Sequence, residues 1–272
     1  MSSTGLQPSP LPSPAKFVIA IGSGKGGVGK STVSLNVALA LNDEGTRVGL
    51  LDADVFGPNI PRMLGLARAR SVSSWELARN SKLGPVRINP LERYGLQVMS
   101  SGLIMGEDHP LTLSSAFIDM IVRQFFIDVA WSDLDYLIVD LPPGTAELHQ
   151  TLTERFPLDC AVVVVTPEDV AHLDGRRAIA MFRRAGVSVL GGVENMAGMS
   201  CPHCLANIDL LPRAADERTI WAREVPRLGS VPFDPAVAAG GESGTPIMIS
   251  APESASASGF RRLAERIMQG AA

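Results

Sequence analysis

The feature that most constrains this chain is a glycine-rich segment near its start. The segment fits the phosphate-loop pattern G-x-x-x-x-G-K-[ST] and reads Gly24-Lys25-Gly26-Gly27-Val28-Gly29-Lys30-Ser31-Thr32. An apolar run over residues 17–21 comes before it and predicts a buried strand, and apolar residues recur at helical spacing over residues 32–41 after it. This strand–loop–helix context distinguishes a working phosphate loop from a glycine-rich turn that binds nothing.

Each residue type in the segment has a use in holding a nucleoside triphosphate. Glycines allow successive backbone N–H groups to turn inward around the β-phosphate, at the positive end of the following helix. We expect Lys30 to bridge the β- and γ-phosphates, the Ser31 hydroxyl to ligate Mg²⁺, and Thr32 to help hold the α-phosphate. The sequence therefore predicts a site for ATP and Mg²⁺ on this loop.

Lys25 adds a second prediction, because an ordinary phosphate loop needs no lysine just after its first glycine. The K-G-G-V-G-K-[ST] form resembles the deviant Walker A motif of the MinD, ParA and nitrogenase iron-protein class. In that class the extra lysine crosses a dimer interface and contacts the nucleotide of the partner subunit. The resemblance implies that Lys25 acts in trans, as an arginine finger does, and that the active unit is a homodimer. The alternative is a solvated loop lysine.

The composition is that of a globular protein with one α/β domain. The chain has 272 residues, of which 46% are hydrophobic and 19% charged, and its formal net charge is −4. The acidic balance disfavours nucleic acid or an anionic membrane as the main partner, and no apolar run reaches the ~18–20 residues of a membrane span. Residues 1–15 are rich in serine and proline, so we expect a disordered tail there and the ATPase domain over residues 16–272. Three cysteines argue against a disulfide scaffold and favour a reducing compartment, the cytoplasm.

Two carboxylates follow the second predicted strand, over residues 48–51. Asp52 and Asp54 are expected at the carboxyl end of a strand in a parallel sheet, where ligands bind in open α/β folds. Asp52 then suits the Mg²⁺ shell and Asp54 suits the orientation of the attacking water. The Gly-Pro-Asn-x-Pro run over residues 57–61 is a candidate switch loop that senses the γ-phosphate. The alternative for either aspartate is a cap on the next helix.

A second magnesium-binding signal comes at Asp140. Four mostly apolar residues, 136–139, precede it and make a Walker B strand, whose carboxylate would hold Mg²⁺ through a water. The rigid Pro142-Pro143 pair and Gly144 follow, and they suit a loop whose position reports the nucleotide state. The alternative is a buried strand with a capping aspartate.

Strand-like and helix-like segments alternate along the rest of the chain. Strands are predicted over residues 96–99, 161–166 and 186–193, and helices over residues 114–131, 170–184 and 263–268. We therefore predict a single P-loop NTPase domain with a mostly parallel β-sheet and helices on both faces. Residues 67–95 have weak periodicity and form an insert of uncertain order. Asn195 and Pro232 each follow a predicted strand and are expected to contact the adenine base.

A pair of cysteines, Cys201 and Cys204, is the third chemical signal. A lone C-x-x-C supplies two thiolates, whereas structural zinc sites and [4Fe–4S] clusters normally need four ligands. Two copies of the chain facing each other would supply four and complete one site at their interface. Spacing leaves open zinc, held by the same dimer or with His203, as well as a redox dithiol or two unrelated surface cysteines. The third cysteine, Cys160, lies in an apolar run and is expected to be inert.

The motifs together resemble the Mrp/ApbC family of iron–sulfur cluster carrier ATPases, through the segments GKGGVGKST, LLDADVFGPNIPRMLGL, DYLIVDLPPGT, TPEDVAHLDGRRAIAMFRR, VENM and CPHC. The resemblance covers nearly the whole chain from Lys16. It implies a homodimer that holds a labile [4Fe–4S] cluster between Cys201 and Cys204 of each subunit. It also implies slow, switch-like ATP hydrolysis coupled to loading the cluster or passing it to apo iron–sulfur proteins. Two other functions remain open: a positioning ATPase like MinD or ParA without a metal, and a zinc-bridged dimer with ATP as a structural ligand.

This chain departs from that family pattern in three places. Many relatives carry Trp-Arg-Gly-Pro near residues 111–115, where this chain has Leu-Thr-Leu-Ser-Ser. Relatives often have Phe-Gly-x-Gly-Gly after the cysteines, where this chain has Leu-Pro-Arg-Ala-Ala over residues 211–215. Gly-Thr-Gly-Asp after the two prolines is replaced by Gly-Thr-Ala-Glu over residues 144–147. The second departure bears directly on the shape of the cluster pocket.

Overall fold

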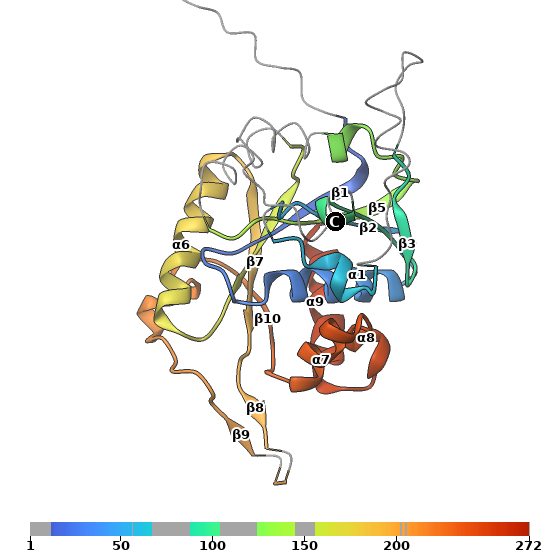
Figure 1. The fold of residues 1–272 in the computed structure, drawn as a ribbon. Helices are drawn as coiled ribbons and strands as arrows, with labels where there is room; N and C mark the ends of the chain where they lie inside the picture. Colours follow the sequence, from blue (N-terminus) through green and yellow to red (C-terminus); the bar gives the residue numbers. More distant parts are fainter. Residues whose placement is uncertain are drawn as a thin grey trace, which may run out of the picture.

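The structure is a computed structural model that describes residues 12–55, 57–66, 88–103, 124–144, 156–201, 203–204 and 206–271. Within these ranges a central sheet is flanked by helices (Figure 1). Its strands are β1 (Ala15–Gly22), β2 (Val48–Asp52), β3 (Leu91–Arg93), β4 (Leu96–Ser100), β5 (Leu134–Asp140), β6 (Cys160–Val165), β7 (Ser188–Asn195) and β10 (Arg227–Val231). The helices are α1 (Lys30–Asp43), α2 (Ile60–Met63), α6 (Asp169–Arg184), α7 (Pro235–Ser243), α8 (Ile247–Ser250) and α9 (Ala255–Ala271).

The strand order in the described sheet is β10-β7-β6-β1-β5-β2-β4-β3. Every neighbouring pair is parallel except β3 and β4, which form an antiparallel edge. The interior strands β1, β2, β5 and β6 are buried almost throughout, because helices cover both faces and leave no solvated side for polar residues. The prediction of a mostly parallel sheet is confirmed.

The alternation of side chains along the strands shows which helix covers which face. Val163 and Val164 are consecutive in β6 and therefore point to opposite faces. A glycine of α6, Gly175, approaches the side chain of Val163, which places α6 on that face. Gly229 of β10 is the Cα partner of Val193, which in turn is the Cα partner of Val164, so all three residues belong to the other face. Leu263 of α9 packs on Gly229 and therefore places α9 on that face. Helices on both faces are thus confirmed, with α1 packed against α9 (Figure 1).

The sheet brings the predicted nucleotide motifs to a single edge. Strands β2 and β5 are parallel neighbours in which Asp52 and Asp140 are direct Cα partners. Strand β1 lies on the other side of β5, and its residue Ile21 is the Cα partner of Asp140. Because all three strands end at the same level, the phosphate loop after β1 lies beside both carboxylates, as expected for the carboxyl edge of an open α/β sheet.

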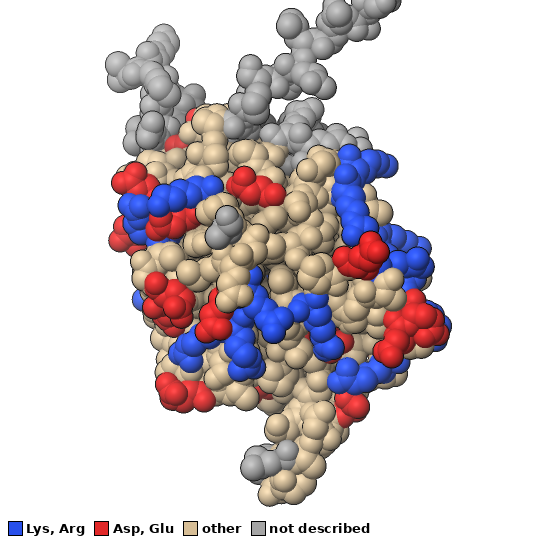
Figure 2. Space-filling model, turned by 180° about the vertical axis from the view of Figure 1, so that it is seen from behind, with Lys and Arg blue, Asp and Glu red and all other residues tan. Residues whose placement is uncertain are grey.

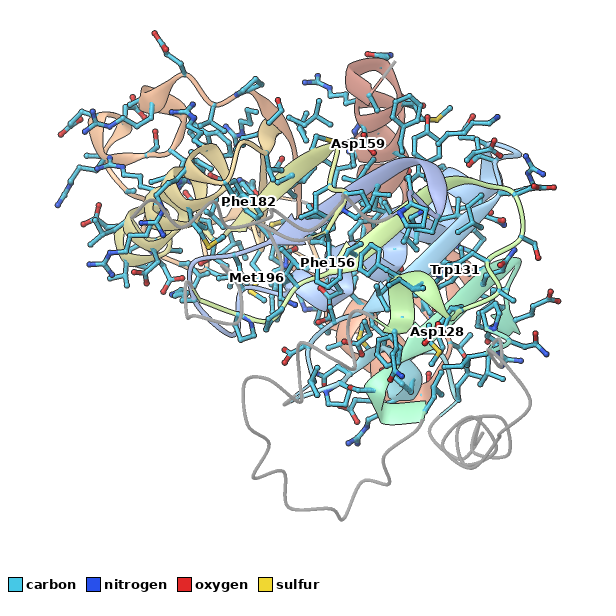
Figure 3. The ribbon with its side chains drawn as sticks, turned by 90° about the horizontal axis from the view of Figure 1, so that it is seen from above. Asp128, Trp131, Phe156, Asp159, Phe182 and Met196 are labelled. Atoms are coloured by element: carbon cyan, nitrogen blue, oxygen red, sulfur yellow. The ribbon has the colours of Figure 1, made fainter. Side chains whose placement is uncertain are left out.

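The helix predicted over residues 114–131 ends earlier than expected. Residues 114–123 lie outside the described ranges, and the helix that the structure describes from residue 124 stops at residue 127. Val129 instead forms a parallel bridge with Ile88. The indole of Trp131, which is labelled in Figure 3, donates to the Phe125 carbonyl. A tertiary strand pairing has overridden the helical spacing here, which local sequence could not reveal.

Several other predictions lie wholly or partly outside the described residues. They concern residues 1–11 of the tail predicted over residues 1–15, most of the insert over residues 67–95, and the departures at 111–115 and 145–147. The described end of the insert forms β3 and the turn into β4. Among the described residues no helix is long and apolar enough to cross a membrane.

A short hairpin of β8 (Met199–Ser200) and β9 (Asn207–Ile208) projects from the body of the molecule (Figure 1). The projection carries the cysteine pair and, over residues 199–208, no Lys, Arg, Asp or Glu. On the rest of the face seen in Figure 2, positive and negative side chains are intermixed, whereas the projection is free of both.

Candidate nucleotide and metal-ligand sites

The phosphate loop forms the floor of a cavity of about 400 Å³. Gly29 has a φ of 80° and is the N-cap residue of α1, so the helix begins at Lys30 with its N–H groups aimed at the cavity. A left-handed backbone of this kind favours glycine. The lining includes most of the loop: Lys25, Gly26, Gly27, Val28, Gly29, Lys30, Ser31 and Thr32. The positive end of a 14-residue helix therefore faces an open, loop-lined space suited to phosphate.

Gly24 fixes how the loop meets the neighbouring helix. A Cβ at this position would lie 2.0 Å from the backbone of Asp174 in α6, so only glycine permits the approach. A Cβ at Gly26 would meet nothing nearer than Pro143 at 4.0 Å. The two glycines therefore have different roles. Gly24 allows the close approach of α6, whereas Gly26 leaves the adjacent cavity open.

A buried ion pair lies beneath the loop. Lys30 Nζ donates to Asp140 Oδ1 at 2.7 Å, and the two side chains are 6% and 0% exposed. Ser34, one turn after Lys30 in α1, donates to the same oxygen at 2.8 Å. Asp140 Oδ2 is buried and has no hydrogen-bond partner among the residues that the structure describes. A buried carboxylate oxygen without a donor suits a bound cation or its water, so the residues present fit Mg²⁺.

Asp52 lies beside this pair but its oxygens are already occupied. It accepts hydrogen bonds from the Asp54 and Ile60 backbone N–H groups and from the Ser100 hydroxyl. Burial raises the pKa of Asp52 well above its usual range, the charge of Asp140 raises it further, and Lys30 opposes both. Asp52 thus shapes the loop that follows β2, and its expected place in the Mg²⁺ shell stays a prediction.

The far wall of the cavity comes from segments distant in sequence. Asp54 lines it and accepts from the Gly57 N–H, which holds the start of the candidate switch loop. Arg62 of α2 and Glu242 of α7 also line it and form an ion pair of 2.5 Å with each other. The C-terminal part of the chain therefore closes the nucleotide cavity, a role that no motif indicates.

Lys25 has a partner within its own chain. Its ammonium lies 3.7 Å from Glu168, the residue just before α6, and the Thr166 hydroxyl donates to the same carboxylate oxygen at 2.7 Å. The lysine side chain is 30% exposed and lines the cavity. It is therefore held at the rim by one weak, partly solvated contact, which leaves it able to change partners at low cost.

The two residues expected at the adenine base lie together at the end of adjacent strands. Asn195 is the Cα partner of Val231, and Pro232 follows directly. The Asn195 side-chain amide donates to the Val28 carbonyl at 2.9 Å, a contact with the phosphate loop that the sequence did not predict. A Cβ at Gly29 would lie 2.2 Å from the same nitrogen, so loop and amide are in tight contact. The expected role at the base stays a prediction.

The cysteine pair lies at the tip of the hairpin. Cys201 is partly exposed, Cys204 is exposed, and the Cys201 N–H donates to the Ala206 carbonyl at 2.8 Å. Donation to the Cys201 sulfur by the backbone of His203, then by the backbone and thiol of Cys204, lowers the Cys201 pKa. The described part of the chain contains no group of three or more His, Cys, Asp or Glu side chains placed to hold a metal. Two thiols, of which Cys201 has a lowered pKa, thus stand on a projection where the described residues bring no further group of metal ligands to them.

The third cysteine differs from this pair in its burial and in the direction of its pKa shift relative to Cys201. Cys160 begins β6 and is buried. Burial raises the pKa of its thiol to about 11, with a further contribution from Asp159. The prediction that this thiol is structural agrees with its position.

Besides the cavity wall from α2 and α7, sequence reasoning missed Ser34, Glu168, Glu194 and Arg213, which the structure brings to these sites. Ser34 could have been found from its helical spacing to Lys30, because residues four apart share a helix face. Glu168, Glu194 and Arg213 carry no local signal, since each has a partner in a distant segment of the chain.

The sequence matches a known protein family over almost its whole length. The family model is described as ParA, NUBPL iron-transfer P-loop NTPase, and it matches residues 14–268. The chain is 45% identical over 253 residues to the iron-sulfur cluster carrier protein of Synechocystis sp., covering 93% of this chain and 70% of that protein.

Solved structures with the same fold agree with this match. The nucleotide-binding protein in complex with ADP from Archaeoglobus fulgidus has a TM-score of 0.73 and 32% sequence identity, covering 91% of this chain and 93% of its own. The cell division ATPase MinD of Pyrococcus furiosus has a TM-score of 0.69 and 25% identity, covering 93% and 99%.

Proposed function

The chain belongs to the NUBPL iron-transfer P-loop NTPase family, and from this premise we propose that it is an ATP-hydrolysing carrier of iron–sulfur clusters. The observation that carries the proposal is the pairing of two features on one chain. The chain has a cavity lined by the phosphate loop and, separately, a projection that carries two thiols, Cys201 and Cys204. The cluster is the cargo, and each chain supplies half of its ligands.

ATP would bind with its phosphates over the loop and the start of α1. Lys30 would contact the β- and γ-phosphates while remaining close to Asp140, so its charge is shared between a fixed carboxylate and the ligand. Ser31 would hold Mg²⁺ directly and Asp140 would hold it through a water. Mg²⁺, when bound, neutralises charge on the β- and γ-phosphates. Asp54, on the cavity wall, would orient the attacking water.

Lys25 would act on the nucleotide of a second subunit. In the single chain it is paired with Glu168 at 3.7 Å across a partly solvated gap. Exchanging that partner for a phosphate of the facing subunit costs little, because the Glu168 contact is weak. A positive charge beside the transferring phosphoryl group stabilises the negative charge of the transition state and lowers the barrier to hydrolysis. Turnover would therefore depend on dimer formation, which brings Lys25 to that position.

The dimer would also complete the cluster site. A [4Fe–4S] cluster normally takes four thiolates, and the hairpin of each chain offers two. The exposed position at the tip suits a cargo that must be released to apo iron–sulfur proteins, since a buried cluster could not be passed on.

Anaerobic reconstitution with iron and sulfide tests this function. The wild-type protein should bind about four irons per dimer and absorb in the visible charge-transfer region. The double variant Cys201→Ala/Cys204→Ala should bind none. The matched control is Cys160→Ala, which also removes a thiol. It should bind iron as the wild type does, because Cys160 is buried in strand β6 and is not part of the hairpin. Zinc without iron would instead identify a zinc-bridged dimer, and absence of both metals would indicate a positioning ATPase.

A further inference from the structure

The end of strand β7 connects the nucleotide site to the cysteine hairpin. Its last two residues, Glu194 and Asn195, are consecutive in a strand and therefore point to opposite faces of the sheet. Asn195 donates to the Val28 carbonyl of the phosphate loop at 2.9 Å. Six residues after Asn195 the chain reaches Cys201. One tightly packed amide thus joins the phosphate loop to the end of the strand that leads into the hairpin.

On the opposite face, Glu194 holds the returning arm of the same hairpin. The side chain is 5% exposed and accepts from Arg227 at 2.6 Å and from Arg213 at 3.4 Å. A carboxylate this buried needs compensating charge, and the two arginines supply it from different segments. Arg227 belongs to β10 within the sheet, whereas Arg213 follows β9 and comes from outside the sheet.

Arg213 contacts both arms of the hairpin at once. It pairs with Asp209, just after β9, at 2.9 Å, and donates to the Ala197 carbonyl, just before β8, at 3.2 Å. The hydrogen bond to the Asp209 carboxylate raises the pKa of the guanidinium, burial opposes this, and the charge of Glu194 adds to the rise, so the side chain stays charged. One planar, multi-donor side chain therefore joins the outgoing arm, the returning arm and the end of β7, a geometry that lysine could not reproduce.

The next residue makes a second connection to the nucleotide site. The Ala214 N–H donates to the Pro167 carbonyl at 2.8 Å. Pro167 precedes Glu168, the carboxylate that pairs with Lys25 of the phosphate loop at 3.7 Å. The segment around Arg213 is thus tied to the loop along two routes, and it occupies the stretch where relatives in this family often carry a glycine-rich sequence.

We propose that Arg213 is a positioning residue that couples nucleotide binding at the phosphate loop to the geometry of Cys201 and Cys204. Nucleotide that displaces Val28 shifts Asn195 and the end of β7, and Arg213 carries that shift to both arms of the hairpin. Linkage requires the reverse effect as well, so a cluster held by the cysteines changes nucleotide affinity by the same factor. The biological use of this coupling rests on the proposed carrier function, but the coupling itself can be tested without a bound cluster.

The test measures thiol reactivity of the complete, metal-free chain. Modification of Cys201 and Cys204 by 5,5′-dithiobis(2-nitrobenzoate) is followed with and without a non-hydrolysable ATP analogue and Mg²⁺, and buried Cys160 serves as the internal unreactive standard. The wild-type rate should change at least about fivefold on nucleotide binding, the lower end of typical allosteric coupling. In Arg213→Met the ratio should fall to about one, with nucleotide affinity retained because Arg213 does not line the cavity.

Two companion variants make the result specific. Arg213→Lys keeps the charge but loses the three-way contact, so it should behave like Arg213→Met. Arg47→Met removes a similarly exposed arginine, 54% against 44% for Arg213, that pairs with Asp133 and Asp135 at the opposite, amino-terminal ends of β2 and β5, and it should keep the wild-type ratio. The fold should survive the Arg213 substitutions, because Arg227 still compensates Glu194 at 2.6 Å.

The outcomes separate this inference from the proposed function. A wild-type ratio of one, or an Arg213→Met ratio equal to that of the wild type, would overturn the coupling role of Arg213. Neither result depends on whether the chain binds iron, zinc or no metal, because the protein is metal-free throughout. Conversely, a chain that fails to bind iron but shows the predicted loss of coupling would keep this inference and contradict the carrier function.

Discussion

Replacing Lys30 by methionine tests the buried ion pair on which the nucleotide site is built. Lys30 and Asp140 are 2.7 Å apart, and their side chains are 6% and 0% exposed. Methionine fills a similar volume but removes the cation, which leaves Asp140 beside a second buried carboxylate, Asp52. Removing one partner of a buried pair typically costs about 3–5 kcal/mol, because the remaining charge has lost both water and its counter-ion. We expect that loss in the free energy of unfolding at about pH 8.

The loss should depend on pH in a defined direction. In the wild type, burial and then Asp140 raise the pKa of Asp52, while Lys30 lowers it. Without Lys30 the folded-state pKa of Asp52 rises further. A carboxyl group whose pKa is raised on folding reduces stability as pH climbs from its unfolded value through its folded value, since the unfolded chain releases the proton first. The loss of unfolding free energy in Lys30→Met, relative to the wild type, should therefore be smaller at about pH 5.5 than at about pH 8.

Equilibrium urea denaturation of the metal-free, nucleotide-free chain measures both effects. Thermal unfolding should show a midpoint lowered on the order of 10 °C at the higher pH. Lys16→Met is the matched control: it also breaks a lysine–aspartate pair of 2.8 Å, but the lysine is 67% exposed. Its midpoint should stay close to that of the wild type, because water replaces the lost partner. A Lys30→Met protein as stable as the wild type at about pH 8, or one whose deficit grows toward acid pH, would refute the reasoning.

Three further predictions concern neighbouring parts of the molecule. Gly24→Ala should lose about 1–3 kcal/mol of stability in urea denaturation, because its Cβ would lie 2.0 Å from the Asp174 backbone. Gly26→Ala, whose Cβ would meet nothing nearer than 4.0 Å, should keep wild-type stability, and equal losses in both variants would contradict the packing. Asp54→Ala should bind ATP but release phosphate at least ~100-fold more slowly, and unchanged release would exclude it as the group that orients water. Cys160, whose thiol pKa burial raises to about 11, should react with a thiol reagent only after urea is added, and reaction in the folded protein would contradict its burial.

Most of the architecture could be predicted because its determinants are local. A phosphate loop between a buried strand and a helix specifies one folding unit, and the alternation of apolar runs with helical spacing specifies a parallel sheet covered on both faces. The predicted end of the helix at residue 131 was wrong because it is decided by a contact that is not local. Val129 pairs with Ile88, and periodicity within a segment contains no information about a partner some 40 residues away in the chain.

The candidate sites divide along the same line. Motifs identified the phosphate loop, the two strand-end carboxylates and the cysteine pair, because each of these functions needs particular residue types at fixed spacing. The sequence could not indicate that Asn195 contacts Val28 or that Glu168 pairs with Lys25. It also could not indicate that α7 closes the cavity. Each of these contacts joins segments that lie far apart in the chain.

By itself, then, the sequence determined the chemistry that the chain can offer: a triphosphate cradle, carboxylates for a hard cation, and two soft thiolates. Only the tertiary structure decided how these groups are connected. The strand order brings β1, β5 and β2 to one edge, and the opposite-facing side chains at the end of β7 reach the loop on one side and Arg213 on the other. The physical reason is that residue type fixes what an atom can bind, whereas distance and burial, which fix how strongly it does so, arise only when segments far apart in the chain pack together.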